Sequence, residues 1–257
     1  MENPRASACI VVYKGADEAA RAARSLLEHT QYPLEIYLVD NNSPDGAGQA
    51  LEKMPFPDNV HVVRLAENVG FGKGHNAVIP MLTSCYHFVV NPDITLEEDS
   101  ISALCSWMDD HPDVVMATPR LKYPSGEEQY TAKRRPTFAA LLARQLPLPF
   151  LKGVERHYLM LDEDLSIPRE IDFCTGCFFV IRTDVFRRMG GFDESYFMYV
   201  EDPDITREAQ KYGKVFYVPV TYVHHAWHRD PNKKLSSFTM QIRSMLHYWH
   251  KWGFRLF

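Results

Sequence analysis

Four short apolar runs in the first ninety residues constrain the fold of this chain most. They span residues 8–13, 35–39, 60–65 and 86–90, and alanines and leucines at helical spacing fill residues 19–27 between the first two. Near-continuous apolar strands joined by helices form parallel sheets covered on both faces. We therefore predict an α/β protein with a mostly parallel central sheet, helices on both faces and a ligand site beyond the carboxyl ends of the strands.

Composition limits the class of protein. The 257 residues are 46% hydrophobic, enough for a full core, and a net charge of −5 argues against a nucleic-acid-binding protein. No apolar run is long enough for a signal peptide or a membrane span, so we expect a cytoplasmic protein. Five cysteines cannot all pair, and the lone Cys174-x-x-Cys177 motif lacks the second half of a zinc site, so we expect reduced core thiols.

Polar residues follow the predicted strands. Tyr13 and Asp40 end the first two strands, and Asp40 could accept hydrogen bonds from a nucleotide base or ribose, although a plain turn explains it as well. Asn91 and Asp93 follow the fourth strand. Asp93 is well placed to bind Mg²⁺ or Mn²⁺, which take oxygen ligands and share them with substrate phosphates, while an Asx turn is the alternative.

A glycine-rich stretch, ENVGFGKGHN, occupies residues 67–76 after the third strand. Alternate glycines would let the backbone approach a ligand and present N–H groups to phosphate. The spacing G-x-G-x-G after the third strand differs from the dinucleotide-binding fingerprint, so that interpretation is weak. Pro80 limits the following helix to a short one.

An acidic cluster at residues 201–204 directly follows an aromatic run, which indicates a cleft. Pro203 suits the first position of a helix, so we predict Asp202 as the N-cap and Gly213 as the C-terminal stop. The helix dipole would then keep Asp202 ionised, and an ionised, held carboxylate can act as a general base. Capping without chemistry is the alternative.

Histidines and cations supply further candidates. His224, His225 and His228 fall within five residues, and one of them could complete a metal site begun by Asp93, although an interior histidine is the default for each. Residues 119–170 indicate an irregular insertion with a helix, for which a lid is one role. Its basic triplet, residues 133–135, would bind an anion or remain solvated surface charge.

The chain ends in an amphipathic pattern rich in aromatic and basic residues. We divide the chain into a domain of residues 1–235 and a terminal helix of residues 236–257. Such a helix can lie on an anionic membrane surface, or it can pack against the body or against a second subunit in a homodimer.

Three motifs, NVGFGKGHN, VVNPD and GGFDESYFMYVEDPD, occur in an order that resembles the inverting family-2 glycosyltransferases of the GT-A fold. The resemblance is closest to the bacterial rhamnosyltransferase-like group, which builds O-antigens and other cell-wall and surface polysaccharides, and it spans nearly the whole chain. It implies a Rossmann-like GT-A sheet, a nucleotide-sugar donor with dTDP-L-rhamnose favoured, and Mn²⁺ or Mg²⁺ as cofactor. It also implies a glycan or lipid-linked acceptor, met in the cytoplasm or at the inner face of the membrane.

The resemblance gives individual positions a role. It implies that Asp202 is the catalytic base, and that Asp93 binds the metal with His225, or with His224 in the alternative register. The positions that it implies for the nucleotide sugar are Tyr13, Asp40, Asn68, Gly70, Gly72, Asn76, Asn91, Glu201 and Arg229. The chain departs from the family's usual T-Y-N at the first strand's end, where it has Tyr13-Lys14-Gly15, so base contact there rests on the tyrosine.

Two other functions suit the same kind of sheet. A nucleotidyltransferase should carry a basic signature near the amino terminus, where Lys14 stands alone. A non-catalytic sugar-nucleotide or glycan-binding protein would keep the fold and lack turnover.

Overall fold

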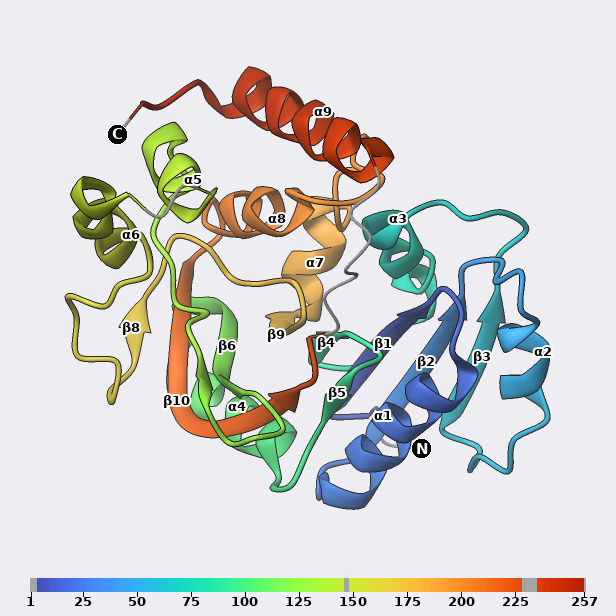
Figure 1. The fold of residues 1–257 in the computed structure, drawn as a ribbon. Coiled ribbons are helices and arrows are strands. Elements are labelled where there is room, and N and C mark those ends of the chain that lie inside the picture. The colour runs from blue at the N-terminus through green and yellow to red at the C-terminus, as the bar shows by residue number, and fades with distance from the viewer. Residues whose placement is uncertain (1–3, 146–147, 228–234, 257) are drawn as a thin grey trace.

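The computed structural model describes residues 4–145, 148–227 and 235–256, and a ten-stranded mixed sheet forms its centre (Figure 1). The strands are β1 (Ala6–Val12), β2 (Leu34–Asp40), β3 (Val60–Arg64), β4 (Tyr86–Val90), β5 (Ile94–Thr95), β6 (Val114–Lys122), β7 (Glu128–Gln129), β8 (Arg169–Glu170), β9 (Phe178–Arg182) and β10 (Lys214–His225). The main order is β3-β2-β1-β4-β9-β6-β10-β5, with β7 beside β6 and β8 beside β10.

The first four of these strands are parallel, as predicted, and so are β6 and β10. Strand β9 runs antiparallel between β4 and β6, and its first residue, Phe178, pairs with Val90 at the end of β4. The segment that leads into β9 therefore lies at the same edge as the carboxyl ends of the parallel strands, where ligands of α/β sheets bind.

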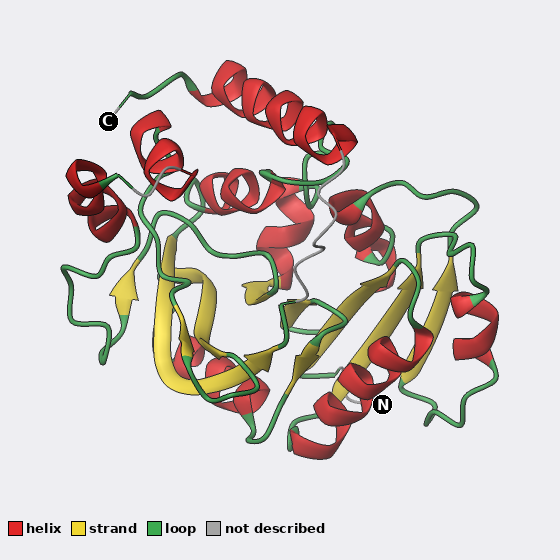
Figure 2. Ribbon diagram, in the orientation of Figure 1, coloured by secondary structure: helices red, strands yellow, loops and turns green. Residues whose placement is uncertain are grey.

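Helices lie on both faces of the sheet, and Figure 2 shows them on either side of the central strands. They are α1 (Ala16–His29), α2 (Ala47–Glu52), α3 (Phe71–Asn76), α4 (Ser100–Asp109), α5 (Phe138–Gln145), α6 (Lys152–Tyr158), α7 (Thr183–Met189), α8 (Glu201–Ala209) and α9 (Leu235–Trp252), with short 3-10 turns η1 (Ile79–Met81) and η2 (Pro149–Leu151). Because side chains alternate along a strand, Ala8 and Ile10 of β1 join the core with α1, α2 and α4. Cys9 and Val11 join the core with α7 and α8.

The middle of the chain is more regular than the predicted insertion of residues 119–170. Strand β6 continues to Lys122, and β7, α5, α6 and β8 follow within those bounds. The helices α5 and α6 pack around Ala140, Tyr158 and Phe173, which form a small core of their own.

The terminal helix α9 packs against the body, on the loop that precedes α8 (Figure 1). Tyr248 is buried against Tyr196 and Val200, and Lys251 forms ion pairs with Asp193 and Asp204. Among the described residues, no helix is long and apolar enough to cross a membrane.

Candidate active site

Two acidic segments far apart in the sequence meet at the start of β9. The backbone N–H of Asn91, just past β4, donates to the carbonyl of Cys177 at 2.8 Å. The N–H of Gly176 donates to Asp202 Oδ2 at 3.4 Å. A Cβ atom on Gly176 would lie 3.1 Å from the Asp202 Cβ, so a glycine is what lets α8 approach this closely. The residues after β4 and the first turn of α8 therefore share one edge of the sheet.

Asp93 and His225 form the first pair of side chains at this edge. Strands β5 and β10 pair antiparallel with Ile94 opposite His225, and the Ala226 N–H donates to the Asp93 carbonyl at 3.1 Å. This register places His225 Nε2 3.5 Å from Asp93 Oδ1, with both side chains largely buried. The turn that follows β4 and the end of β10 thus bring the two predicted metal ligands together.

Gln129 of β7 fixes the orientation of the His225 ring. Its Nε2 donates to the His225 carbonyl at 2.7 Å, so its Oε1, 2.9 Å from His225 Nδ1, accepts the proton of that nitrogen. In the neutral ring Nε2 then carries the lone pair, and an imidazole nitrogen and a carboxylate oxygen are both groups that bind divalent ions. The residues present therefore fit a divalent ion.

A metal here would have few protein ligands. Among the described residues, no third histidine, cysteine or acid joins Asp93 and His225 in a cluster that could hold a metal. Mg²⁺ and Mn²⁺ commonly use one or two protein ligands and take the rest from substrate phosphates and water. His224 points to the other face of β10, where its Nε2 lies 3.1 Å from Glu97 Oε2. The geometry favours His225 over His224.

Glu201 and Asp202 form the second pair, in the first turn of α8. Glu201 is buried, and its Oε2 has no hydrogen-bond partner among the described residues. Burial, and then the adjacent Asp202 charge, raise the pKa of Glu201 to about 8. Burial also raises the pKa of Asp202, against the opposing effects of Lys133 and the Gly176 N–H. We predicted that the helix terminus keeps Asp202 ionised. Burial has the larger effect and acts in the opposite direction, toward the protonated form.

The predicted N-cap is also wrong. Helix α8 begins at Glu201, after Val200 as N-cap, so Asp202 lies inside the first turn. Tyr199 and Val200 both have left-handed backbones, with φ of 71° and 70°, a strained geometry for a β-branched residue. Helix α9 supports it, because Tyr248 packs on Val200 and Ser244 Oγ donates to the Met198 carbonyl at 2.9 Å. These tertiary contacts decide where the helix begins.

Lys133 is the residue that sequence reasoning missed. It is buried rather than part of a solvated triplet, and its Nζ donates to Thr175 Oγ1 at 3.0 Å above the Phe173 ring. Burial lowers the pKa of Lys133 to about 8, and the Asp202 charge opposes this shift. Its neighbours do form partly exposed ion pairs, Arg134 with Asp162 of the same insertion and Arg135 with Asp172 just beyond it. Nothing in a run of three cations distinguishes the one that is buried.

The glycine stretch packs against protein rather than forming an open cradle. A Cβ on Gly70, whose φ is +87°, would lie 2.1 Å from the Phe197 carbonyl oxygen. At Gly72 it would lie 2.7 Å from the Phe192 Cβ, and at Gly74 2.9 Å from Val11 Cγ1. Close packing of α3 therefore explains why these positions are glycine, and contact of Gly70 or Gly72 with a phosphate stays a prediction.

The asparagines of the same stretch hold backbone. Asn68 Oδ1 accepts from the Gly70 N–H at 3.1 Å. Asn76 donates from Nδ2 to the Phe192 carbonyl and accepts the Phe192 N–H at Oδ1, both at 2.8 Å. Asn76 thus fixes the loop that leads to α8, and direct contact of either asparagine with a donor stays a prediction.

The remaining predicted positions differ in accessibility. Tyr13 is half-exposed beyond the end of β1. Asp40 is buried, accepts the Ser43 N–H at 3.0 Å and faces Arg64, so its carboxylate shapes the turn after β2. Arg229 lies outside the described residues, and so does His228.

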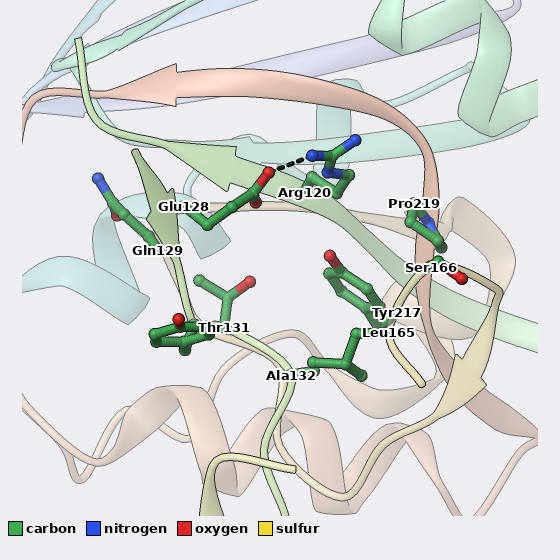
Figure 3. A pocket seen from close by; sticks show the side chains of 10 residues that line it. Arg120, Glu128, Gln129, Thr131, Ala132, Leu165, Ser166, Tyr217 and Pro219 are labelled. Carbon is green, nitrogen blue, oxygen red and sulfur yellow. Dashed lines mark hydrogen bonds and ion pairs between the residues drawn. The ribbon is translucent and has the colours of Figure 1, made fainter. Parts of the chain in front are cut away.

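A cavity of about 330 Å³ lies beside the first pair, and Gln129 forms part of its wall (Figure 3). Arg120 and Glu128 form an ion pair at one side, and Thr131 and Tyr217 also line it. Gln129, which orients His225, is thus also a lining residue of this cavity.

Comparisons with known proteins agree with this fold and give the family. The sequence profile of glycosyl transferase family 2 matches residues 7–190. The N-acetylglucosaminyl-diphospho-decaprenol L-rhamnosyltransferase of Mycobacterium tuberculosis (strain H37Rv) is 29% identical, over 88% of this chain and 79% of that protein. Rhamnosyltransferase WbbL of Escherichia coli K12 is 23% identical, over 70% of this chain and 69% of WbbL. The structure of GalNAc-T7 with UDP, GalNAc and Mn²⁺ is similar in fold, with a TM-score of 0.70 and 16% identity, over 95% of this chain and 48% of that one.

Proposed function

Because this chain belongs to glycosyl transferase family 2, we propose that it moves L-rhamnose from dTDP-L-rhamnose to a hydroxyl group of a lipid-linked or cell-surface glycan. Glycosyl transfer is the activity of the family, and polysaccharide biosynthesis is its setting here. The names of the two bacterial relatives support rhamnose as the sugar and a lipid-linked acceptor. A lipid-linked acceptor would place the enzyme in the cytoplasm, at the inner face of the membrane.

The observation that carries this proposal is the meeting of two unlike pairs at the start of β9. Asp93 and His225 would hold Mn²⁺ or Mg²⁺, which would neutralise the charge on the departing nucleoside diphosphate. Mn²⁺ in the similar GalNAc-T7 structure supports a metal. The Gln129 amide keeps His225 in the tautomer that can bind a cation.

Asp202 is the base in this proposal. Inversion requires the acceptor hydroxyl to attack the anomeric carbon from the face opposite the leaving group, while its proton passes to a carboxylate. The raised pKa of Asp202 suits a group that must accept a proton, and Lys133 keeps that pKa from rising further. Burial raises the pKa of Glu201, which favours the protonated carboxyl, a group that can donate a hydrogen bond.

The test is a panel of nucleotide sugars with Mn²⁺, scored by thermal stabilisation and by slow hydrolysis of the donor. With all sugars at one concentration, we expect dTDP-L-rhamnose to give the largest effect. The stabilisation would be about 2.7 kcal/mol where that concentration is 100 times its Kd. A larger effect from another sugar would overturn rhamnose as the donor. Donor binding without hydrolysis or transfer to any acceptor would favour the non-catalytic alternative.

A further inference from the structure

The terminal helix has a second apolar face that the body does not cover. Ser244 and Tyr248 point inward and are buried. Phe238, Ile242 and Leu246 recur every four residues on the opposite side and are exposed by 58%, 44% and 59%. An amphipathic helix that merely caps a domain would carry polar residues there.

The chain after α9 extends this apolar surface onto α5. The N–H groups of Phe138 and Ala139 donate to the carbonyls of Arg255 and Leu256 at 3.0 Å, so the last residues run along the start of α5 (Figure 1). Phe254 stacks edge-on against Trp249 and stays largely exposed, as does Leu256. We call the exposed side chains of Phe138, Phe238, Ile242, Leu246, Phe254 and Leu256 the terminal face.

The charge around the terminal face is positive, although the whole chain carries −5. Residues 235–257 contain no acid, and residues 138–152, which include α5, contain none either. Arg243 and Arg255 are exposed on these segments, whereas the Arg144 charge acts on the pKa values of Asp202 and of the buried Tyr158. Lys251 differs, because it is bound to Asp193 and Asp204 on the inward side. Two acid-free segments from different parts of the sequence therefore lie together.

We propose that the terminal face docks on the surface of a bilayer that contains anionic phospholipid. Interfacial helices combine exposed aromatic and aliphatic side chains with flanking arginines that meet lipid phosphates. A second copy of this chain fits less well, since self-association would bring the same cations together. The inference rests on the proposed function in one respect, since a lipid-linked acceptor makes such docking useful.

The test is sedimentation of the full chain with vesicles, without donor or acceptor. We expect binding to vesicles of phosphatidylglycerol and phosphatidylcholine, with weak binding to phosphatidylcholine alone and release at high salt. Ile242→Glu should lower the partition coefficient at least tenfold. Ile167→Glu is the matched control, because Ile167 is equally exposed, at 46%, on the loop before β8 and should leave binding unchanged.

Three outcomes would overturn the proposal. The first is equal partition of the two glutamate variants, and the second is no binding of the native chain to anionic vesicles. The third is a dimer at micromolar concentration that Ile242→Glu dissociates, which would assign the face to self-association. Thermal unfolding would check that both variants are folded. The nucleotide-sugar panel tests sugar transfer separately, so the membrane proposal and the transferase proposal can each fail alone.

Discussion

The two pairs of side chains at the start of β9 are built in opposite ways. Asp93 faces an imidazole whose other nitrogen is held by Gln129, so the two side chains are oriented toward one another. Glu201 and Asp202 are adjacent carboxylates, and Glu201 Oε2 has no partner within the described part of the chain. Burial raises the pKa of both acids of this second pair. One pair is suited to hold a metal, and the other is suited to take up a proton.

Replacement of the proposed base should have the largest effect on turnover. Asp202→Asn keeps the shape of the side chain but cannot accept a proton, so kcat should fall by about 10²–10⁴ while the donor Kd changes little. The control is Asp204→Asn on the same helix. Asp204 binds Lys251 and Trp252, so its loss should lower thermal stability more than kcat. A kcat for Asp202→Asn close to the native value would remove Asp202 as the base.

The metal-ligand pair should respond in metal affinity rather than in proton transfer. Asp93→Asn, or a chelator, should abolish the metal-dependent part of donor binding, which calorimetry with and without Mn²⁺ can measure. Gln129→Ala frees the His225 ring and should weaken Mn²⁺ binding about 10- to 100-fold. Full activity in excess chelator would contradict the role given to Asp93.

Replacement of Lys133 tests whether its charge lowers the pKa of Asp202 in the second pair. Its charge opposes the rise in the pKa of Asp202, so Lys133→Met should raise that pKa further. The acid limb of the kcat/KM profile should then move to higher pH, and at a fixed pH below the limb kcat/KM should fall about tenfold for each pH unit that the limb moves. Lys133→Arg keeps the charge and should move the limb less. An acid limb that stays in place for Lys133→Met would mean that this charge does not act on the base.

Glu201 should give the smallest effect on rate and a distinct effect on stability. Its pKa in the folded chain, about 8, lies above the unfolded value of 4.5, so the folded state holds a proton that the unfolded state loses between these pH values. This costs about 1.4 kcal/mol of stability per pH unit in that window. Glu201→Gln should reduce the slope to the part that Asp202 contributes, and leave kcat at pH 7 within a few-fold. The free energy of unfolding of both proteins at pH 5 and pH 8 checks this. The same pH dependence in the native chain and in Glu201→Gln would show that Glu201 is ionised when folded.

The sheet was predictable because its signal is local. The apolar run at residues 86–90 matches β4 residue for residue, and the polar residues after it follow the carboxyl end of that strand. Alternation of side chains along a strand also separates His224 from His225, which the sequence left open.

Features that depend on distant neighbours were not predictable. Lys133 is buried because Phe173 and Thr175 pass beside it, and α8 starts at Glu201 because α9 supports Val200. The glycines at 70 and 72 are explained by Phe197 and Phe192, more than a hundred residues further along the chain. The pattern and spacing of residues along the sequence do not predict such contacts.

Asp204 connects the last turn of α9 to α8, the helix that carries the proposed base. Trp252 Nε1 and Lys251 Nζ both donate to its carboxylate, at 2.7 and 2.9 Å. Truncation before residue 251 would remove the cation that faces this buried anion, two positions from Asp202, and leave it the Tyr196 hydroxyl at 3.3 Å. Inactivity of a shortened chain would therefore report damage at the reaction centre, and only point changes on the outer surface of α9 can separate attachment to lipid from chemistry.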